Sequence, residues 1–268
     1  MDLSQRRISL FNLPIHDVSS DEAVGVILQF LDEGSIGRFV VTTNAHHVVV
    51  LRRDPDLRRV YQRADLGLAD GMSVVWASCL LRRPLRARVA GSDLFPRLCA
   101  AAAERGDRVF LLGAAPGVAD RAAARLRRRH PGLHVVGTYA PPSGFERHPS
   151  ENEAIVRMIQ EQTPDLLFVA LGFPKQERWI AQHAEACGVS VAMGVGAAFD
   201  FVAGVRRRAP NWMQRAGLEW LYRLMQEPGR LAYRYGVLGL QFIALTAVEW
   251  WRTRRAPTDP QDDPQGRS

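Results

Sequence analysis

Cysteine is scarce in this sequence, whose 268 residues include only Cys79, Cys99 and Cys187. The three lie far apart and form no CxxC pair, which argues against a disulfide framework or a zinc knot and favours a reducing compartment. The N-terminal stretch lacks the continuous apolar segment of a signal peptide. In the C-terminal segment the longest uncharged run, Tyr235–Val248, has fourteen residues, fewer than the roughly twenty that span a bilayer. We therefore expect a cytoplasmic protein.

Several common metal and nucleotide signatures are also missing. The sequence contains no HExxH or EF-hand pattern, no GxGxxG fingerprint and no Walker A loop. His46 and His47 have no further ligand motif beside them, so packing or solvent exposure is the favoured interpretation for this pair. We predict neither a metal nor a cofactor.

Lysine is almost absent, because Lys175 is the one residue among 35 basic side chains that is not arginine. A lysine ammonium is a compact, mobile charge, whereas the guanidinium of arginine is a planar fork. Lys175 follows an apolar run and a Gly-Phe-Pro turn, at the expected start of a helix. Anions are held at such places in α/β proteins, although a single lysine can also fall there by chance.

Apolar strand-like runs alternate with helical patterns over residues 1–204. Ser19 and Glu22 have the spacing of a capping box at the start of the first helix. Strands are expected at Arg38–Thr43, Leu66–Leu68, Arg108–Leu112, Leu133–Gly137, Leu166–Leu171 and Ser190–Val195. Further helices are expected at Ala45–Ala64 (interrupted by Pro55), Ser92–Glu104, Val118–Arg129, Glu151–Gln162 and Lys175–Cys187. This alternation predicts an α/β fold, a Rossmann-like parallel sheet with helices on both faces.

Ligands of such sheets bind at the carboxyl ends of the strands, and five polar or glycine-bearing turns follow predicted strands. Asp70 is a candidate general base or sugar ligand, although an Asp-Gly turn is also common. Thr42 and Asn44 either contact a ligand or cap the next helix. The other three turns are Gly113–Gly117, whose backbone amides could cradle a diphosphate, Gly172–Glu177 and Gly194–Asp200.

The alternation stops after Gly204. Residues 205–255 carry ten arginines against three glutamates, so their net charge of +7 equals that of the whole chain. Helices are expected at Asn211–Glu227 and Arg230–Trp251, separated by Pro228-Gly229. Such a basic block fits a nucleic acid, a membrane surface or a partner protein. Tryptophans beside arginines favour the membrane surface, and residues 256–268 are expected to be disordered.

Seven separated blocks together resemble the WecG/TagA/CpsF family of glycosyltransferases. They are TTNAHHVV (42–49), LADGMSVVWA (68–77), RARVAGSDL (86–94), FLLGAAPGVAD (110–120), FVALGFPKQERWI (168–180), GVGAAFDFVAG (194–204) and RRAPNWMQRAGLEWLYRLMQEPGR (207–230). The resemblance implies inverting, metal-free transfer of N-acetylmannosamine, its uronate or a related hexose from a UDP donor. The implied acceptor is a polyprenyl-diphosphate-linked sugar in surface polysaccharide or teichoic-acid synthesis.

The resemblance also implies roles for individual residues. Asp70 takes the place of the proposed catalytic base, with Thr42 and Asn44 near the reacting sugars. Residues expected to bind substrate are Arg88, Gly113, Gly117, Lys175, Gln176, Gly194, Gly196 and Arg208.

Residues 205–255 correspond to an appendage that docks on the inner face of the membrane, so a peripheral location, anionic lipid and a possible homo-oligomer are expected, without nucleic acid. A nucleotide-binding oxidoreductase of the doubly wound class is the alternative.

Overall fold

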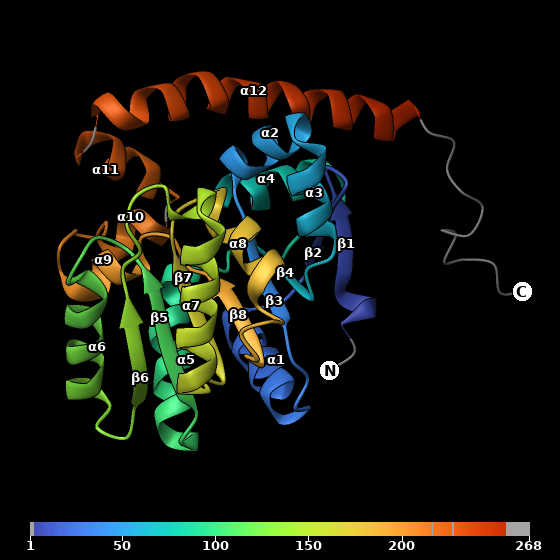
Figure 1. Ribbon diagram of the computed structural model, residues 1–268. Helices are drawn as coiled ribbons and strands as arrows, with labels where there is room; N and C mark the ends of the chain where they lie inside the picture. Colours follow the sequence, from blue (N-terminus) through green and yellow to red (C-terminus); the bar gives the residue numbers. More distant parts are fainter. Residues whose placement is uncertain (1–2, 216, 227, 256–268) are drawn as a thin grey trace, which may run out of the picture.

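The computed structural model describes residues 3–215, 217–226 and 228–255. Six parallel strands form the central sheet in the order β4-β3-β8-β7-β5-β6 (Figure 1). Their bounds are β3 (Arg38–Thr43), β4 (Leu66–Ala69), β5 (Arg108–Gly113), β6 (His134–Tyr139), β7 (Leu166–Ala170) and β8 (Val191–Gly194). The fold class predicted from the sequence is therefore confirmed.

Strand β7 shows why the sheet is buried on both faces. Leu166 and Phe168 pack into one core cluster, whereas Leu167 and Val169 pack into the other. Successive side chains of a strand point to opposite faces, so an uninterrupted apolar run is suited to a strand covered on both sides.

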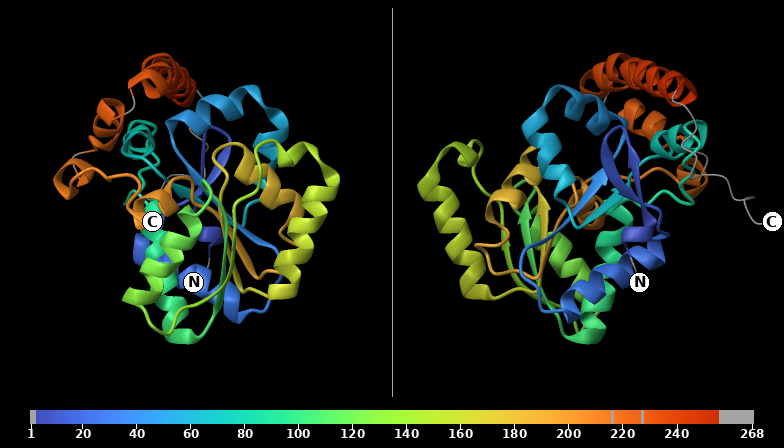
Figure 2. Two further views of the ribbon diagram at one scale, coloured as in Figure 1. Left: turned by 60° about the vertical axis from the view of Figure 1, so that its left-hand side comes forward. Right: turned by 90° about the vertical axis from the view of Figure 1, so that its right-hand side faces the viewer.

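Two helical layers cover the sheet (Figure 2). One core cluster draws on α1 (Ser20–Asp32), α5 (Gly91–Arg105), α6 (Val118–Arg129) and α9 (Ala198–Ala203). The opposite cluster draws on α2 (Ala45–Arg53), α3 (Pro55–Gln62), α4 (Met72–Leu80), α7 (Pro149–Gln162) and α8 (Lys175–His183). Short 3₁₀ turns occupy Ser4–Arg6 and Phe145–Arg147.

Two predicted helix starts are confirmed by their caps. The Ser19 hydroxyl accepts a hydrogen bond from the Glu22 amide, and the Glu22 carboxylate accepts one from the Ser19 amide. Pro55 opens α3, where the Asp54 carboxylate accepts from the Leu57 amide. Although Asp54-Pro55-Asp56 spells DxD, a pattern that can hold a divalent ion on a diphosphate, neither aspartate lines the cavity described below.

One β-hairpin and two helices were not predicted. Strands β1 (Arg7–Leu10) and β2 (Leu13–His16) form a hairpin that packs tightly on β4, where a Cβ atom at Gly67 would lie 2.2 Å from the Pro14 carbonyl oxygen. The other two are α4 and α9. Four-residue strands and a helix as uniformly apolar as α4 give little periodicity, so the pattern did not reveal them.

The C-terminal segment differs from its prediction at one point. The single helix expected over Asn211–Glu227 is divided into α10 (Asn211–Arg215) and α11 (Glu219–Gln226). Gly217, between them, has φ 72°, and a Cβ atom there would lie 3.0 Å from the Trp76 ring. The chain turns at this position because glycine permits both the backbone conformation and the close approach.

Helix α12 (Pro228–Arg255) crosses the carboxyl-end edge of the sheet above α2 (Figure 1). The rings of Phe11 and Phe242 lie 5.5 Å apart and tie α12 to the hairpin. Within the described residues, no helix combines the length and apolarity needed to cross a membrane. The expected tail, 256–268, lies outside the described residues.

Candidate active site

A cavity of about 1390 Å³ opens at the carboxyl ends of the strands, between the sheet and the C-terminal helices. The predicted site residues that line it are Thr42, Asn44, Asp70, Arg88, Lys175, Gln176 and Gly196. The predicted residues that do not line it are Gly113, Gly117, Gly194 and Arg208. The structure therefore brings seven of the eleven candidates to one cavity and leaves the other four outside its lining.

Asp70 comes directly after β4, and its position is set by the backbone. Its amide donates a 2.8 Å hydrogen bond to the Thr43 carbonyl, which continues the pairing of β4 with β3. Its side chain is 30% exposed and forms part of the cavity wall. The backbone of Asp70 is therefore held by the sheet, while its carboxylate is accessible to a ligand in the cavity.

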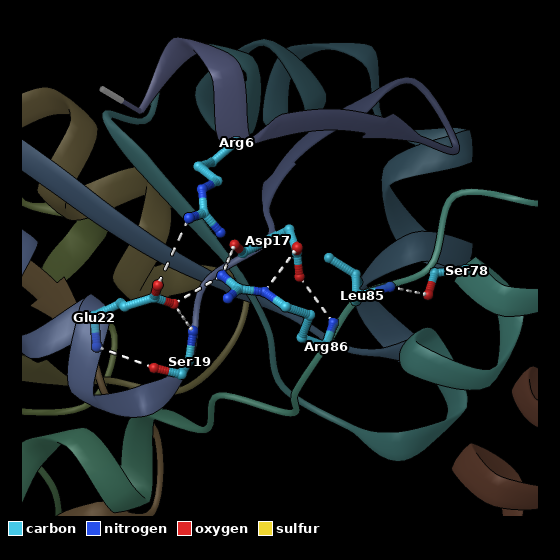
Figure 3. A network of polar contacts seen from close by, with 7 residues as sticks. All are labelled: Arg6, Asp17, Ser19, Glu22, Ser78, Leu85 and Arg86. Atoms are coloured by element: carbon cyan, nitrogen blue, oxygen red, sulfur yellow. Dashed lines mark hydrogen bonds and ion pairs between the residues drawn. The ribbon is translucent and has the colours of Figure 1, made fainter. Parts of the chain in front are cut away.

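Arg88 reaches the site on a loop that is held by its neighbours. The Arg86 amide and guanidinium donate to the two carboxylate oxygens of Asp17 at 2.8 and 2.9 Å, and the guanidinium also donates to Glu22 at 2.8 Å (Figure 3). The Val89 amide donates to the Ala69 carbonyl at 2.8 Å, beside the end of β4. These contacts put the Arg88 guanidinium 4.0 Å from the Asp70 carboxylate.

An ion-pair cluster connects Arg88 to the C-terminal segment. Arg88 lies 2.9 Å from Asp93 and 3.5 Å from Glu219 of α11. Arg208 pairs with the same aspartate and lies 3.8 Å from the same glutamate. Burial opposes ionisation of Asp93, but the two guanidinium groups outweigh it and lower the pKa of that carboxyl. The cluster holds α11 against the site, and no local sequence pattern predicts the part played by Glu219.

Asn44 has the capping role that the sequence allowed. Its side-chain oxygen accepts from the amides of His46 and His47 at 3.0 and 3.2 Å, at the start of α2. Its amide nitrogen lies 3.2 Å from Nε2 of His47. Asn44 also lines the cavity, and its catalytic role remains a prediction.

His47 is packed into the wall of the site. Its Nδ1 lies 2.8 Å from the Thr42 carbonyl oxygen, and its ring stacks on Phe173 at 4.0 Å. The interpretation of this histidine as a packed residue is therefore confirmed. Phe173 belongs to the Gly-Phe-Pro turn, so the stack joins the end of β3 to the turn that precedes Lys175.

A buried carboxyl group behind the cavity was not predicted. Glu177 is only 1% exposed, and burial raises its pKa to about 7, against the opposing hydrogen bonds from Gln176 and Tyr61. Gln176 donates to Glu177 at 2.9 Å and accepts from the Gly196 amide at 3.2 Å. The sequence does contain one signal of this burial, because Glu177 falls on the face of α8 that packs inward.

Gln176 explains the need for glycine at position 194. A Cβ atom on Gly194 would lie 2.6 Å from the Gln176 amide nitrogen. Gly194 therefore shapes the site by making room for Gln176.

Lys175, the first residue of α8 after β7, lines the cavity and has a carboxylate partner. Its Nζ lies 2.5 Å from Glu146, and this hydrogen bond lowers the pKa of Glu146. Its side chain is about half exposed. An anionic ligand that enters the cavity here meets the Lys175 ammonium group, which is also paired with the exposed Glu146 carboxylate.

The Gly113–Gly117 turn presents Ala114 to the cavity rather than its glycines. Gly113 has φ 110°, and a Cβ atom there would lie 2.6 Å from the Ala170 carbonyl oxygen. Gly117, with φ 76°, precedes α6. Both glycines set the path of the turn, and their contact with a diphosphate remains a prediction.

A parallel sheet with a large cavity at the carboxyl ends of its strands places the protein in the ligand-binding α/β class. The sequence model of the glycosyl transferase WecG/TagA/CpsF family matches residues 8–256. The chain belongs to this family and is a glycosyltransferase, which removes the oxidoreductase alternative.

Curated bacterial relatives share most of their length with the chain. An N-acetylglucosaminyldiphosphoundecaprenol N-acetyl-beta-D-mannosaminyltransferase of Bacillus spizizenii is 37% identical over 75% of this chain and 76% of its own length. Proteins of the same name from Bacillus subtilis and Staphylococcus aureus are 29% and 33% identical. The match to the Bacillus subtilis protein covers 83% of this chain and 84% of that protein. The match to the Staphylococcus aureus protein covers 75% of this chain and 77% of that protein.

Proposed function

We propose that the protein transfers N-acetylmannosamine, or a closely related sugar, from a UDP donor to a polyprenyl-diphosphate-linked N-acetylglucosamine with inversion. Family membership and the names of the relatives support the sugar and the acceptor. The observation that carries the proposal is the Asp70 carboxylate, which projects from a fixed backbone into a cavity of about 1390 Å³. That volume exceeds the roughly 300–1,000 Å³ of ordinary small-molecule sites and suits two substrates.

In the proposed mechanism, Asp70 accepts the proton of the acceptor hydroxyl as its oxygen attacks C1 of the donor sugar. The bond from C1 to the UDP oxygen breaks on the opposite face, which inverts the anomeric centre. Lys175 meets the charge that develops on UDP, and Gly196 lines the same cavity. Arg88 puts a positive charge 4.0 Å from the Asp70 carboxylate.

The test is sugar transfer with a panel of UDP-sugars and a short-chain prenyl-diphosphate acceptor. Asp70→Asn should lower kcat by about 10²-fold or more, the usual contribution of a general base, while UDP affinity measured by calorimetry stays near that of the wild type. Asp56→Asn, an exposed substitution on α3, is the matched control. Wild-type transfer rates in Asp70→Asn would refute the base assignment.

We also propose that the C-terminal segment docks on the anionic inner surface of the membrane. Trp251 is half exposed near the end of α12, and the Arg254 guanidinium lies 4.1 Å from the ring centre of Trp250. Aromatic rings beside arginines suit the lipid headgroup region. Combined Trp251→Ser and Arg252→Gln should reduce co-sedimentation with anionic vesicles more than Arg128→Gln on α6; equal binding would contradict the assignment.

A further inference from the structure

One wall of the cavity is made by α12, whose lining residues form a buried row, Leu238, Phe242 and Thr246, and beside it an apolar stripe. The stripe consists of Gly236, Gly239, Leu240, Ile243 and Ala247. These positions are three, four, seven and eleven residues after the first, so they share one face of the helix. None is charged or polar, and together they form a continuous apolar surface, which we call the α12 stripe.

The space over the α12 stripe is open. A Cβ atom built on Gly236 or Gly239 meets no other atom within 4 Å. Leu240 and Ile243 are 69% and 64% exposed, although both line the cavity. Large side chains exposed together inside a cavity commonly mark a binding surface.

Helix α4 adds apolar groups to the same cavity. Trp76 and Leu80 line it and are each about half exposed. Asp70 lies just before α4, so the apolar part of the cavity is continuous with the part that holds the proposed base. A ligand suited to this shape has a polar head near Asp70 and a linear apolar chain.

We propose that the α12 stripe, with Trp76 and Leu80, is a subsite for the isoprene units of the acceptor that lie next to its diphosphate. This inference rests on the proposed function, because it needs a polyprenyl acceptor. The stripe covers eleven residue steps, about 17 Å at 1.5 Å per residue. At about 5 Å for each extended four-bond repeat, that length accommodates about three isoprene units.

A membrane surface would use a different part of the same helix. Val237 and Val248 are exposed on α12 but do not line the cavity. They provide matched controls, because polar substitution there changes the apolar surface of α12 without changing the cavity wall.

The experiment compares acceptors with one and with four isoprene units on the same N-acetylglucosaminyl diphosphate. Both are used without vesicles or detergent, below their aggregation concentrations. For the wild type, kcat/KM should be at least about tenfold higher with four units, the effect expected from burying part of an apolar chain. Combined Leu240→Gln and Ile243→Gln should bring the ratio of the two kcat/KM values close to one.

Two further variants distinguish a cavity from a surface. Ala247→Phe keeps the stripe apolar but fills it, so it too should reduce the chain-length ratio. Combined Val237→Gln and Val248→Gln should keep the wild-type ratio, and circular dichroism checks that each variant folds.

The result has distinct meanings for the two proposals. A wild-type enzyme that transfers sugar equally well to both acceptors refutes the subsite alone. So does a ratio that survives Leu240→Gln and Ile243→Gln, or one that the control pair reduces equally. Absence of transfer to either acceptor from any UDP-sugar refutes the proposed function, and the subsite with it.

Discussion

Glu177→Gln should remove a fall in stability that the wild-type protein shows between about pH 4.5 and pH 8. The Glu177 carboxyl is buried behind the active site, and its pKa is raised from 4.5 to about 7. The folded state therefore keeps this proton to a higher pH than the unfolded state does. Below pH 4.5 both states are protonated, and the group adds no pH dependence.

The size of the effect follows from the two pKa values. As pH rises from 4.5 through 7, the unfolded state releases the proton first, so the free energy of unfolding falls. At 1.36 kcal/mol for each pKa unit, the difference between 4.5 and 7 is worth about 3 kcal/mol once Glu177 is ionised in both states. Glutamine stays neutral and lacks this decline.

The assay is urea unfolding of the wild type and Glu177→Gln at pH 5 and pH 8. Loss of the hydrogen-bond partner of Gln176 can change the free energy of unfolding of the variant, but this change is the same at both pH values. The stability of Glu177→Gln relative to the wild type should therefore rise by about 2–3 kcal/mol from pH 5 to pH 8. Glu153→Gln, an exposed position on α7, should show no such rise. Parallel pH profiles for Glu177→Gln and the wild type would refute the reasoning.

Three further substitutions test the walls of the site. Lys175→Ala should weaken UDP binding about tenfold, the usual worth of one charge-assisted contact; calorimetry measures it, and unchanged affinity would contradict a role in donor binding. Gly217→Ala, at φ 72° and 3.0 Å from the Trp76 ring, should cost about 1–2 kcal/mol of unfolding free energy and change tryptophan fluorescence, whereas an unaltered spectrum and stability would contradict the close packing. Asp93→Asn should speed proteolysis of the α11 region, because Arg88 and Arg208 lose their shared carboxylate; wild-type cleavage rates would contradict that linkage.

The regular part of the fold was predictable because its signals are local. Strand β7 is an apolar run of strand length, and Pro55 and the Ser19 capping box mark helix starts. The carboxyl-end rule then brought Asp70, Thr42 and Lys175 to one edge without further information. These inferences depend on the order of strands and helices, which the chain displays directly.

The unpredicted features depend on contacts between distant segments. Glu219 pairs with Arg88 across 131 residues of sequence, and no local pattern indicates that α11 turns back onto the core. Glu177 looks like an ordinary charged residue of a helix until its burial is known. Gly113 and Gly117 do not line the cavity, because their turn presents Ala114 to it instead, and only the backbone dihedral angles of the turn reveal this.

The cavity wall contributed by α12 has a consequence for the order in which the protein matures. The sheet, Asp70 and Arg88 all lie within residues 38–194, and the ribosome makes them before residues 236–247. During synthesis the folded core therefore presents its base and its cations in an open trough. The cavity closes only when α12 folds across α2. Assembly of the reaction chamber thus coincides with formation of the helix proposed to meet the lipid.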